Sequence, residues 1–137
     1  MDLNADNSAL HAAALWSGLI LLLLVALSVP VALSRRRNKI GVGDGGLESL
    51  NLRARAFGNA SEYAPAIIGA LILLALVGYE AWVLHALGAT FLVGRVLHAW
   101  GISRSSGASL GRVVGMALTW TAYVVAAGAL IVCALTT

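Results

Sequence analysis

The sequence contains four long apolar runs, and these constrain the fold more than any other feature. The first extends from His11 to Ser34 without a formal charge, and a helix needs roughly 20 apolar residues to cross a bilayer. With only 11% charged residues, against about 25% in an average soluble domain, the chain could not cover a globule with polar surface. This composition argues against a small soluble enzyme, and 137 residues leave room for about four spans and little else.

The four runs predict an all-α fold, an integral membrane four-helix bundle that forms one membrane domain over residues 1–137. We expect the helices at about residues 9–34, 48–78, 81–103 and 111–135. Pro30 is expected to kink the end of the first helix, and Gly78 to Glu80 to make a tight turn. A secretory signal is the alternative for the first run, but its basic residues would precede the apolar run, whereas Arg35 to Arg37 follow it.

Basic residues predict the orientation of the helices. Eight of the nine fall on the side shared by the first and third connections: Arg35, Arg36, Arg37, Lys39, Arg53, Arg55, Arg104 and Arg112. By the positive-inside rule this side is cytoplasmic. Both termini, including the acidic start at Asp2 and Asp6, are therefore expected on the non-cytoplasmic side. A net charge of +3 gives no nucleic-acid footprint, and the single Cys133 and the scattered histidines give no metal motif.

Two charged residues, Glu62 and Arg95, lie within apolar runs, where each needs a partner, water or a function. Arg55, Asn59 and Glu62 stand at i, i+4 and i+7 and so share one helix face, and Arg95 shares a face with His98. One hypothesis is a structural ion pair between Glu62 and Arg95. The other is a receptor for a polyanionic small molecule, with arginines for its carboxylates and Asn and Glu for its amide or ammonium groups.

Simpler interpretations remain open for several of these residues. Arg55 alone could be a boundary residue that snorkels to the interface, and Arg35 to Arg37 could be only the topology signal. The four tryptophans are interpreted as lipid-facing or interfacial side chains: Trp16, Trp82, Trp100 and Trp120.

The segment RARAFGNASEYAP, which is Arg55-x3-Asn59-x2-Glu62-Tyr63-x-Pro65, resembles the signature of the membrane-associated proteins in eicosanoid and glutathione metabolism, abbreviated MAPEG. The runs GVGDGG and GRVLHAWG are similar to those of its bacterial branch. The resemblance covers about Arg35 to Arg112. It implies a bacterial inner-membrane protein that forms a homotrimer of four-helix subunits, with glutathione bound between adjacent subunits near the cytoplasmic side.

The resemblance also implies roles for individual residues. Those that would hold glutathione are Arg55, Asn59, Glu62, Tyr63, Arg95 and His98, with Arg35 reaching it from a neighbouring subunit. Arg112, or else Arg104, would stabilise the thiolate, which attacks a lipophilic electrophile or hydroperoxide that arrives from the lipid bilayer. Glutathione is then a co-substrate, and no metal is needed.

The sequence departs from the family pattern at Ile102, where the eicosanoid enzymes place a tyrosine, and at Phe57 and Gly58, where some members have polar residues. These departures weigh against a specialised leukotriene or prostaglandin synthase. One alternative is a non-catalytic member that binds a thiol or a lipid. A small multidrug-type exporter is the other, although Glu62 lies among basic groups near a helix entrance and not alone at mid-membrane.

Overall fold

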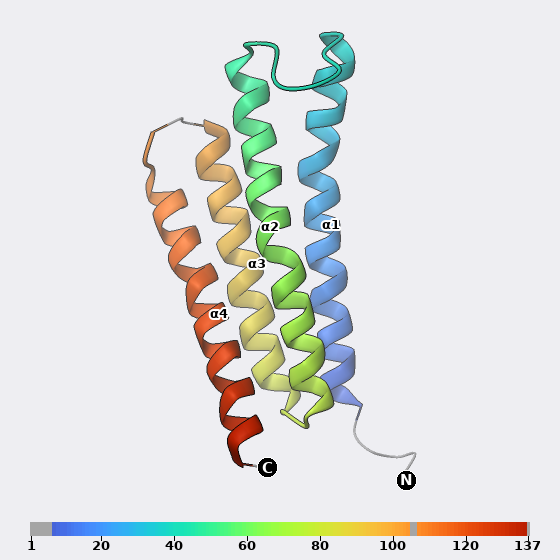
Figure 1. Ribbon diagram of the computed structural model, residues 1–137, viewed down its shortest axis with the longest axis vertical. Helices are drawn as coiled ribbons and strands as arrows, with labels where there is room; N and C mark the ends of the chain where they lie inside the picture. Colours follow the sequence, from blue (N-terminus) through green and yellow to red (C-terminus); the bar gives the residue numbers. More distant parts are fainter. Residues whose placement is uncertain (1–6, 105–106, 137) are drawn as a thin grey trace.

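The computed structural model describes residues 7–104 and 107–136, and within these ranges the chain forms four α-helices and no strands (Figure 1). The helices are α1 (Ser8–Arg37), α2 (Glu48–Leu76), α3 (Ala81–Arg104) and α4 (Leu110–Thr136). All four are long and apolar enough to cross a membrane. The predicted all-α membrane bundle is confirmed, and the helix ends lie within three residues of those expected. Asp2 and Asp6 lie outside the described residues.

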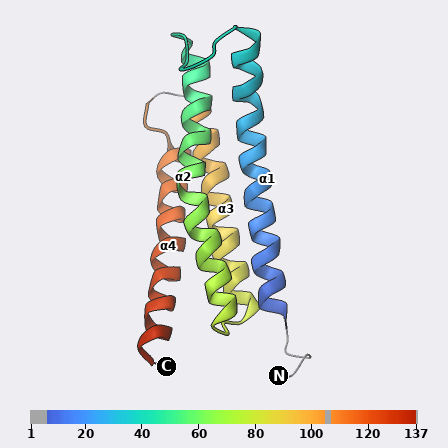
Figure 2. The same cartoon turned by 45° about the vertical axis from the view of Figure 1, so that its right-hand side comes forward.

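The helices run alternately up and down, with α2 and α3 in the middle of the bundle (Figures 1 and 2). Both α2 and α3 contact all three other helices, whereas α1 and α4 do not contact each other within the described residues. The end of the bundle where α1 ends and α2 begins carries the basic residues and is called the basic end below. There α1 and α2 extend beyond the neighbouring ends of α3 and α4 (Figure 1).

The loop at residues 38–47 connects α1 to α2 and is held by Asp44. Its carboxylate accepts hydrogen bonds from the side-chain amide of Asn51 and, at 2.9 Å, from the backbone N–H of Gly46. Because both bonds favour the ionised form, they hold the pKa of Asp44 below its usual value, with the Asn51 bond the larger cause. Gly46 has φ +79°, a left-handed conformation that other residues rarely adopt.

The turn between α2 and α3 is as short as predicted. Gly78 adopts φ +92°, and the N–H of Tyr79 donates to the carbonyl of Leu74 at 3.0 Å. The hydroxyl of Tyr79 donates to the carbonyl of Ala129 at 2.8 Å, which ties this turn to α4.

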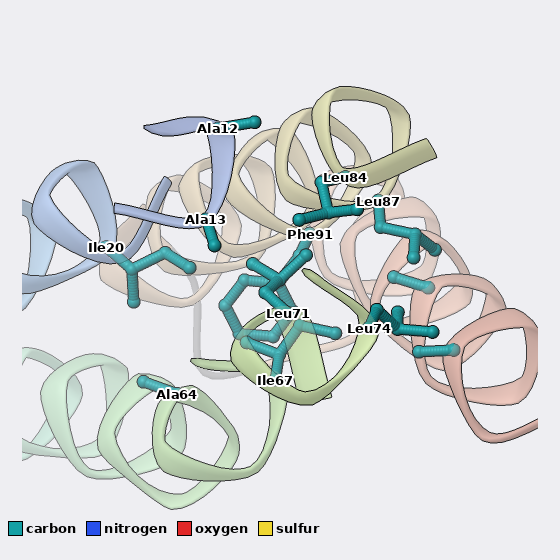
Figure 3. Close-up of a cluster of buried hydrophobic side chains, with 12 residues drawn as sticks. Ala12, Ala13, Ile20, Ala64, Ile67, Leu71, Leu74, Leu84, Leu87 and Phe91 are labelled. Atoms are coloured by element: carbon teal, nitrogen blue, oxygen red, sulfur yellow. The ribbon is translucent and has the colours of Figure 1, made fainter. Parts of the chain in front are cut away.

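Most of the apolar core lies in the half of the bundle near this turn. Figure 3 shows Ile67, Leu71 and Phe91 at its centre, with Ala12 and Ala13 of α1 beside them. At the basic end the buried apolar cluster is small, with Ala56, Ala99 and Ile102 as its buried members. Polar side chains occupy the remaining space between α2, α3 and α4, and the candidate site forms there.

Two glycines let α3 and α4 approach each other closely. A Cβ atom added at Gly115 would lie 2.6 Å from the carbonyl oxygen of Gly94 and 2.6 Å from the backbone nitrogen of His98. Such distances are far inside van der Waals contact, so the two backbones meet here without a side chain between them. This contact brings the N-terminal part of α4 next to His98.

Trp16 corrects one sequence interpretation. Its indole N–H donates to Nδ1 of His85 at 3.0 Å, and its ring covers Gly88, where an added Cβ would lie 2.1 Å from the indole. Trp16 therefore packs α1 onto α3 and is not a lipid-facing side chain, because the missing side chain at Gly88 makes room for it. The other three tryptophans are exposed on the chain, as expected: Trp82, Trp100 and Trp120.

Candidate functional site

A cavity of about 330 Å³ opens between α2, α3 and α4 at the basic end and is called the polar pocket below. Its size lies within the range of roughly 300–1,000 Å³ that small-molecule sites occupy. The lining residues are Arg55, Gly58, Asn59, Glu62, His98, Ile102 and Arg112. Most are polar or charged, although the pocket lies within an otherwise apolar bundle.

The α2 wall of the pocket is the stripe that helical periodicity predicts. Arg55, Asn59 and Glu62 follow one another along a single face, and Gly58 leaves the space between them open. Asn59 is half-buried, whereas Arg55 and Glu62 are exposed in the single chain. The pocket is therefore closed on its α3 side and open outward past α2.

Arg95 of α3 lies behind the pocket and is only 1% exposed. Its Nε donates to the hydroxyl of Thr119 at 2.9 Å, and one terminal nitrogen donates to Oδ1 of Asn59 at 2.6 Å. The other terminal nitrogen approaches the sulfur of Met116 at 3.1 Å and the carbonyl of Gly115 at 3.5 Å. All of these partners are neutral, so the guanidinium charge remains uncompensated among them.

The hypothesis of an ion pair between Glu62 and Arg95 is wrong. Within the described residues Arg95 turns toward α4 and Asn59, where four acceptors surround it, and Glu62 stands at the exposed edge of the polar pocket. The physical reason is that a buried guanidinium needs several acceptors at once, and the backbone and hydroxyl of α4 supply more of them than one exposed carboxylate can.

Tyr63 is placed behind the pocket wall and not on it. Its ring lies under the guanidinium of Arg95, 5.1 Å from the centroid to Cζ, and packs edge-on against the ring of Tyr123 at 5.6 Å. The hydroxyl of Tyr123 donates to the carbonyl of Tyr63. Tyr63 therefore supports Arg95 through a cation–π contact and does not line the cavity.

The structure separates the three other predicted arginines. Arg112, in the first turn of α4, lines the polar pocket and donates to the carbonyl of Gly107 at 2.6 Å. Arg104 ends α3 outside the pocket, with Cζ 4.4 Å from the ring centroid of Trp100. Arg35 is half-buried in the last turn of α1 and is not among the residues that line this pocket.

A second cavity of about 490 Å³ adjoins the polar pocket and shares His98 and Arg112 with it. Its other lining residues are mainly apolar: Ala108, Val113, Met116 and Trp120. Arg112 thus lies between a polar cavity and an apolar one. Among the described residues, no three histidine, cysteine or acidic side chains gather in a way that could hold a metal ion.

Sequence analysis missed the α4 residues that hold Arg95, namely Gly115, Met116 and Thr119. A signal for two of them was present, because Gly115, Thr119, Ala122 and Ala126 repeat at i, i+4, i+7 and i+11 and form a stripe of small residues. All four are buried. The stripe marks the face that α4 turns toward the bundle, and Thr119 is its polar member.

The sequence model of the MAPEG family matches residues 13–132. The chain is 35% identical over 109 residues to inner membrane protein YecN of Escherichia coli K12. This alignment covers 80% of this chain and 82% of the relative. The protein of the same name from Escherichia coli O6:H1 matches equally well.

Proposed function

Because this chain belongs to the MAPEG family, we propose that it binds glutathione in the polar pocket and activates its thiol toward lipophilic electrophiles or hydroperoxides. The observation that carries the proposal is the balance of charge at the pocket. Arg55 and Arg112 line the pocket, and Arg95 lies directly behind it. These three cations are accompanied by one carboxylate, that of Glu62. Glutathione carries two carboxylates, one ammonium group and a thiol, so its charges complement this set.

Each charged residue of the pocket suits a group of opposite charge on glutathione. Arginine binds carboxylate with two parallel hydrogen bonds, and Arg55, at the open edge of the pocket, suits a carboxylate of the tripeptide. Glu62, one helical turn from Asn59, suits the ammonium group. Arg112 stands in the first turn of α4, where the guanidinium and the helix N-terminus both favour a negative charge.

A thiol beside Arg112 is expected to ionise more readily than in water. Its proton passes to solvent, and the thiolate attacks an electrophilic carbon, so that a sulfur–carbon bond forms as the bond to the leaving group breaks. With a hydroperoxide, two glutathione molecules give one disulfide, an alcohol and water. The apolar cavity beside Arg112 offers space for a lipophilic substrate that enters from the bilayer.

We further propose that the protein is a homotrimer of the inner membrane, with its basic end in the cytoplasm and both termini on the other side. The YecN relative is named an inner membrane protein, and the basic residues gather at one end of the bundle. Arg55 and Glu62 are exposed in the single chain, so a neighbouring copy would complete the pocket. Arg35 is the candidate residue from that copy.

The experiment compares two arginine variants in a conjugation assay with glutathione and a generic electrophile. Arg112→Ala should lower kcat/KM about 100- to 1,000-fold, the usual effect of removing a group that stabilises a developing or bound anion. It should also remove the ultraviolet absorbance of the bound thiolate. Arg104→Ala is the matched control, because Arg104 lies outside the pocket, and should leave both unchanged. Equal effects of the two substitutions would contradict the proposal.

A second candidate function is glutathione binding without turnover, and two pocket residues favour it. Ile102 departs from the pattern of the eicosanoid enzymes and Gly58 from that of some other members, and both line the polar pocket. The cavity therefore lacks two polar side chains that could contact the ligand. If the wild-type protein binds glutathione in a calorimetric titration but shows neither thiolate absorbance nor turnover, this second function is the correct one.

A further inference from the structure

We propose that Arg95 is a positioning residue: it holds the side-chain amide of Asn59 so that the NH2 group faces the polar pocket, and the ligand group bound there is a carboxylate or carbonyl oxygen. This inference rests on the proposed function for the identity of the ligand. Asn59 then binds an oxygen acceptor, although an asparagine side chain could by its type also bind an ammonium group.

The first step is the orientation of the amide. A guanidinium has five N–H donors and no acceptor, so the Asn59 atom that faces it at 2.6 Å must be the oxygen. The amide nitrogen then points away from Arg95. It donates to no described residue, and it is not among the buried unpaired atoms, which are Ser17 Oγ and Arg35 Nε. Since Asn59 lines the polar pocket, this nitrogen is accessible from the pocket.

The second step is the rigidity of Arg95. Its Nε donates to the hydroxyl of Thr119, and that hydroxyl donates in turn to the carbonyl of Gly115 at 2.8 Å. The ring of Tyr63 covers one face of the guanidinium. With every edge of the group engaged and 1% of the residue exposed, Arg95 has no room for another rotamer. The amide of Asn59 is therefore fixed before any ligand arrives.

The third step is the chemistry that this arrangement selects. Two N–H donors, backed by a buried positive charge, attract an oxygen acceptor and repel an ammonium group. Of the groups in glutathione, a carboxylate satisfies both the donors and the charge. The ammonium group then belongs with Glu62, three residues further along the same helix face.

The test reverses the polarity of Asn59 without changing its shape. In the Asn59→Asp variant one carboxylate oxygen pairs with Arg95 and the other faces the pocket as an acceptor. We expect a higher melting temperature, because the buried guanidinium gains a counter-ion, and glutathione affinity lower by roughly 10- to 100-fold, because an anion now meets an anion. The two mono-amides of glutathione provide the specificity readout. For one of them the variant should bind more tightly than it binds glutathione, whereas the wild type prefers glutathione.

Thr119→Val is the matched variant for the positioning role, because Thr119 does not line the polar pocket. Freed on one side, Arg95 should hold Asn59 less firmly, and the preference for glutathione over that mono-amide should shrink severalfold. The Thr119→Ser variant keeps the hydroxyl and should keep the preference. A purely structural role would change the melting temperature without changing this preference.

The outcomes separate this inference from the proposed function. If the wild type binds no glutathione, the proposed function fails, and the melting temperature of Asn59→Asp still decides whether Arg95 holds this position. A melting temperature below that of the wild type would overturn the positioning role. An unchanged preference for glutathione over both mono-amides in the Asn59→Asp variant would overturn the assignment of an oxygen acceptor to Asn59.

Discussion

Gly115 determines, by the absence of a side chain, how closely α4 approaches α3. We expect Gly115→Ala to destabilise the protein by about 1–3 kcal/mol, the usual effect of forcing extra volume into a packed contact. The added Cβ would meet backbone atoms of Gly94 and His98, which cannot rotate away. Thermal unfolding in detergent measures the change. Gly128→Ala, on the same helix with nothing within 4 Å of the added atom, is the control and should leave the melting temperature unchanged or slightly higher.

The partner of Arg95 shows what the sequence could and could not predict. Helical periodicity placed Asn59 and Glu62 on one face, and that prediction is confirmed by the pocket. Periodicity does not predict whether Asn59 or Glu62 contacts Arg95. The choice depended on α4, whose Thr119 and Gly115 draw the guanidinium inward, and neighbouring helices cannot be placed from hydropathy alone.

Helix α1 is joined to α3 through Trp16. We expect Trp16→Phe to destabilise the bundle by about 1 kcal/mol, because it removes the hydrogen bond to His85 but keeps most of the ring that covers Gly88. Chemical or thermal unfolding in detergent measures this. Trp120→Phe is the control, because Trp120 is exposed on α4. An equal loss for both variants would show that the contact with His85 contributes nothing.

The loop at residues 38–47 should depend on pH through Asp44. Its pKa is lowered in the folded chain, so the stabilisation is fully present above the ordinary aspartate pKa of about 3.9 and is lost as the pH falls through the lower folded value. Hydrogen exchange at the Gly46 amide should therefore show more protection at pH 6 than at pH 3, after correction for intrinsic rates. In Asp44→Ala the protection should be absent at both values; protection that persists there would assign it to another contact.

The bounds of the helices were largely predictable, because the apolar runs are long and the first three end in glycine or charge. The largest difference is at α1, which continues to Arg37 and not only to residue 34. Arginines in a last turn interact favourably with the unpaired carbonyls of the helix end, and their long side chains reach polar surroundings from within a helix. A change from apolar to basic residues therefore marks the membrane boundary and not the end of the helix.

The open side of the polar pocket leads to a prediction about assembly. The protein in detergent should have a mass three times the 14.1 kDa of one chain, after subtraction of the detergent. Arg35→Ala should weaken glutathione binding about tenfold, although Arg35 does not line the pocket of its own chain, because a charge-assisted hydrogen bond from the neighbouring copy would be lost. Arg36→Ala, at the adjacent exposed position, is the control. A monomeric mass would refute the shared site.

Most of the predicted site residues gather in one place, and those that do not are informative. Arg55, Asn59, Glu62, His98 and Arg112 line the polar pocket, with Arg95 and Tyr63 behind it. The position of Arg104 relative to the pocket could not be predicted, because it depends on where α3 ends. Whether Arg35 lies at the pocket of its own chain depends on how α1 packs in the bundle, which hydropathy does not encode.

The central place of α2 and α3, each in contact with every other helix, predicts how the protein tolerates random mutation. In a library of single substitutions selected for expression in the membrane, changes should be rejected mainly along α2 and α3. The outward faces of α1 and α4 should accept many apolar replacements, because fluid lipid chains adapt to apolar side chains of different shapes. Positions that are exposed on one chain but still reject substitution would then outline, residue by residue, the surface where a second copy packs in the proposed trimer.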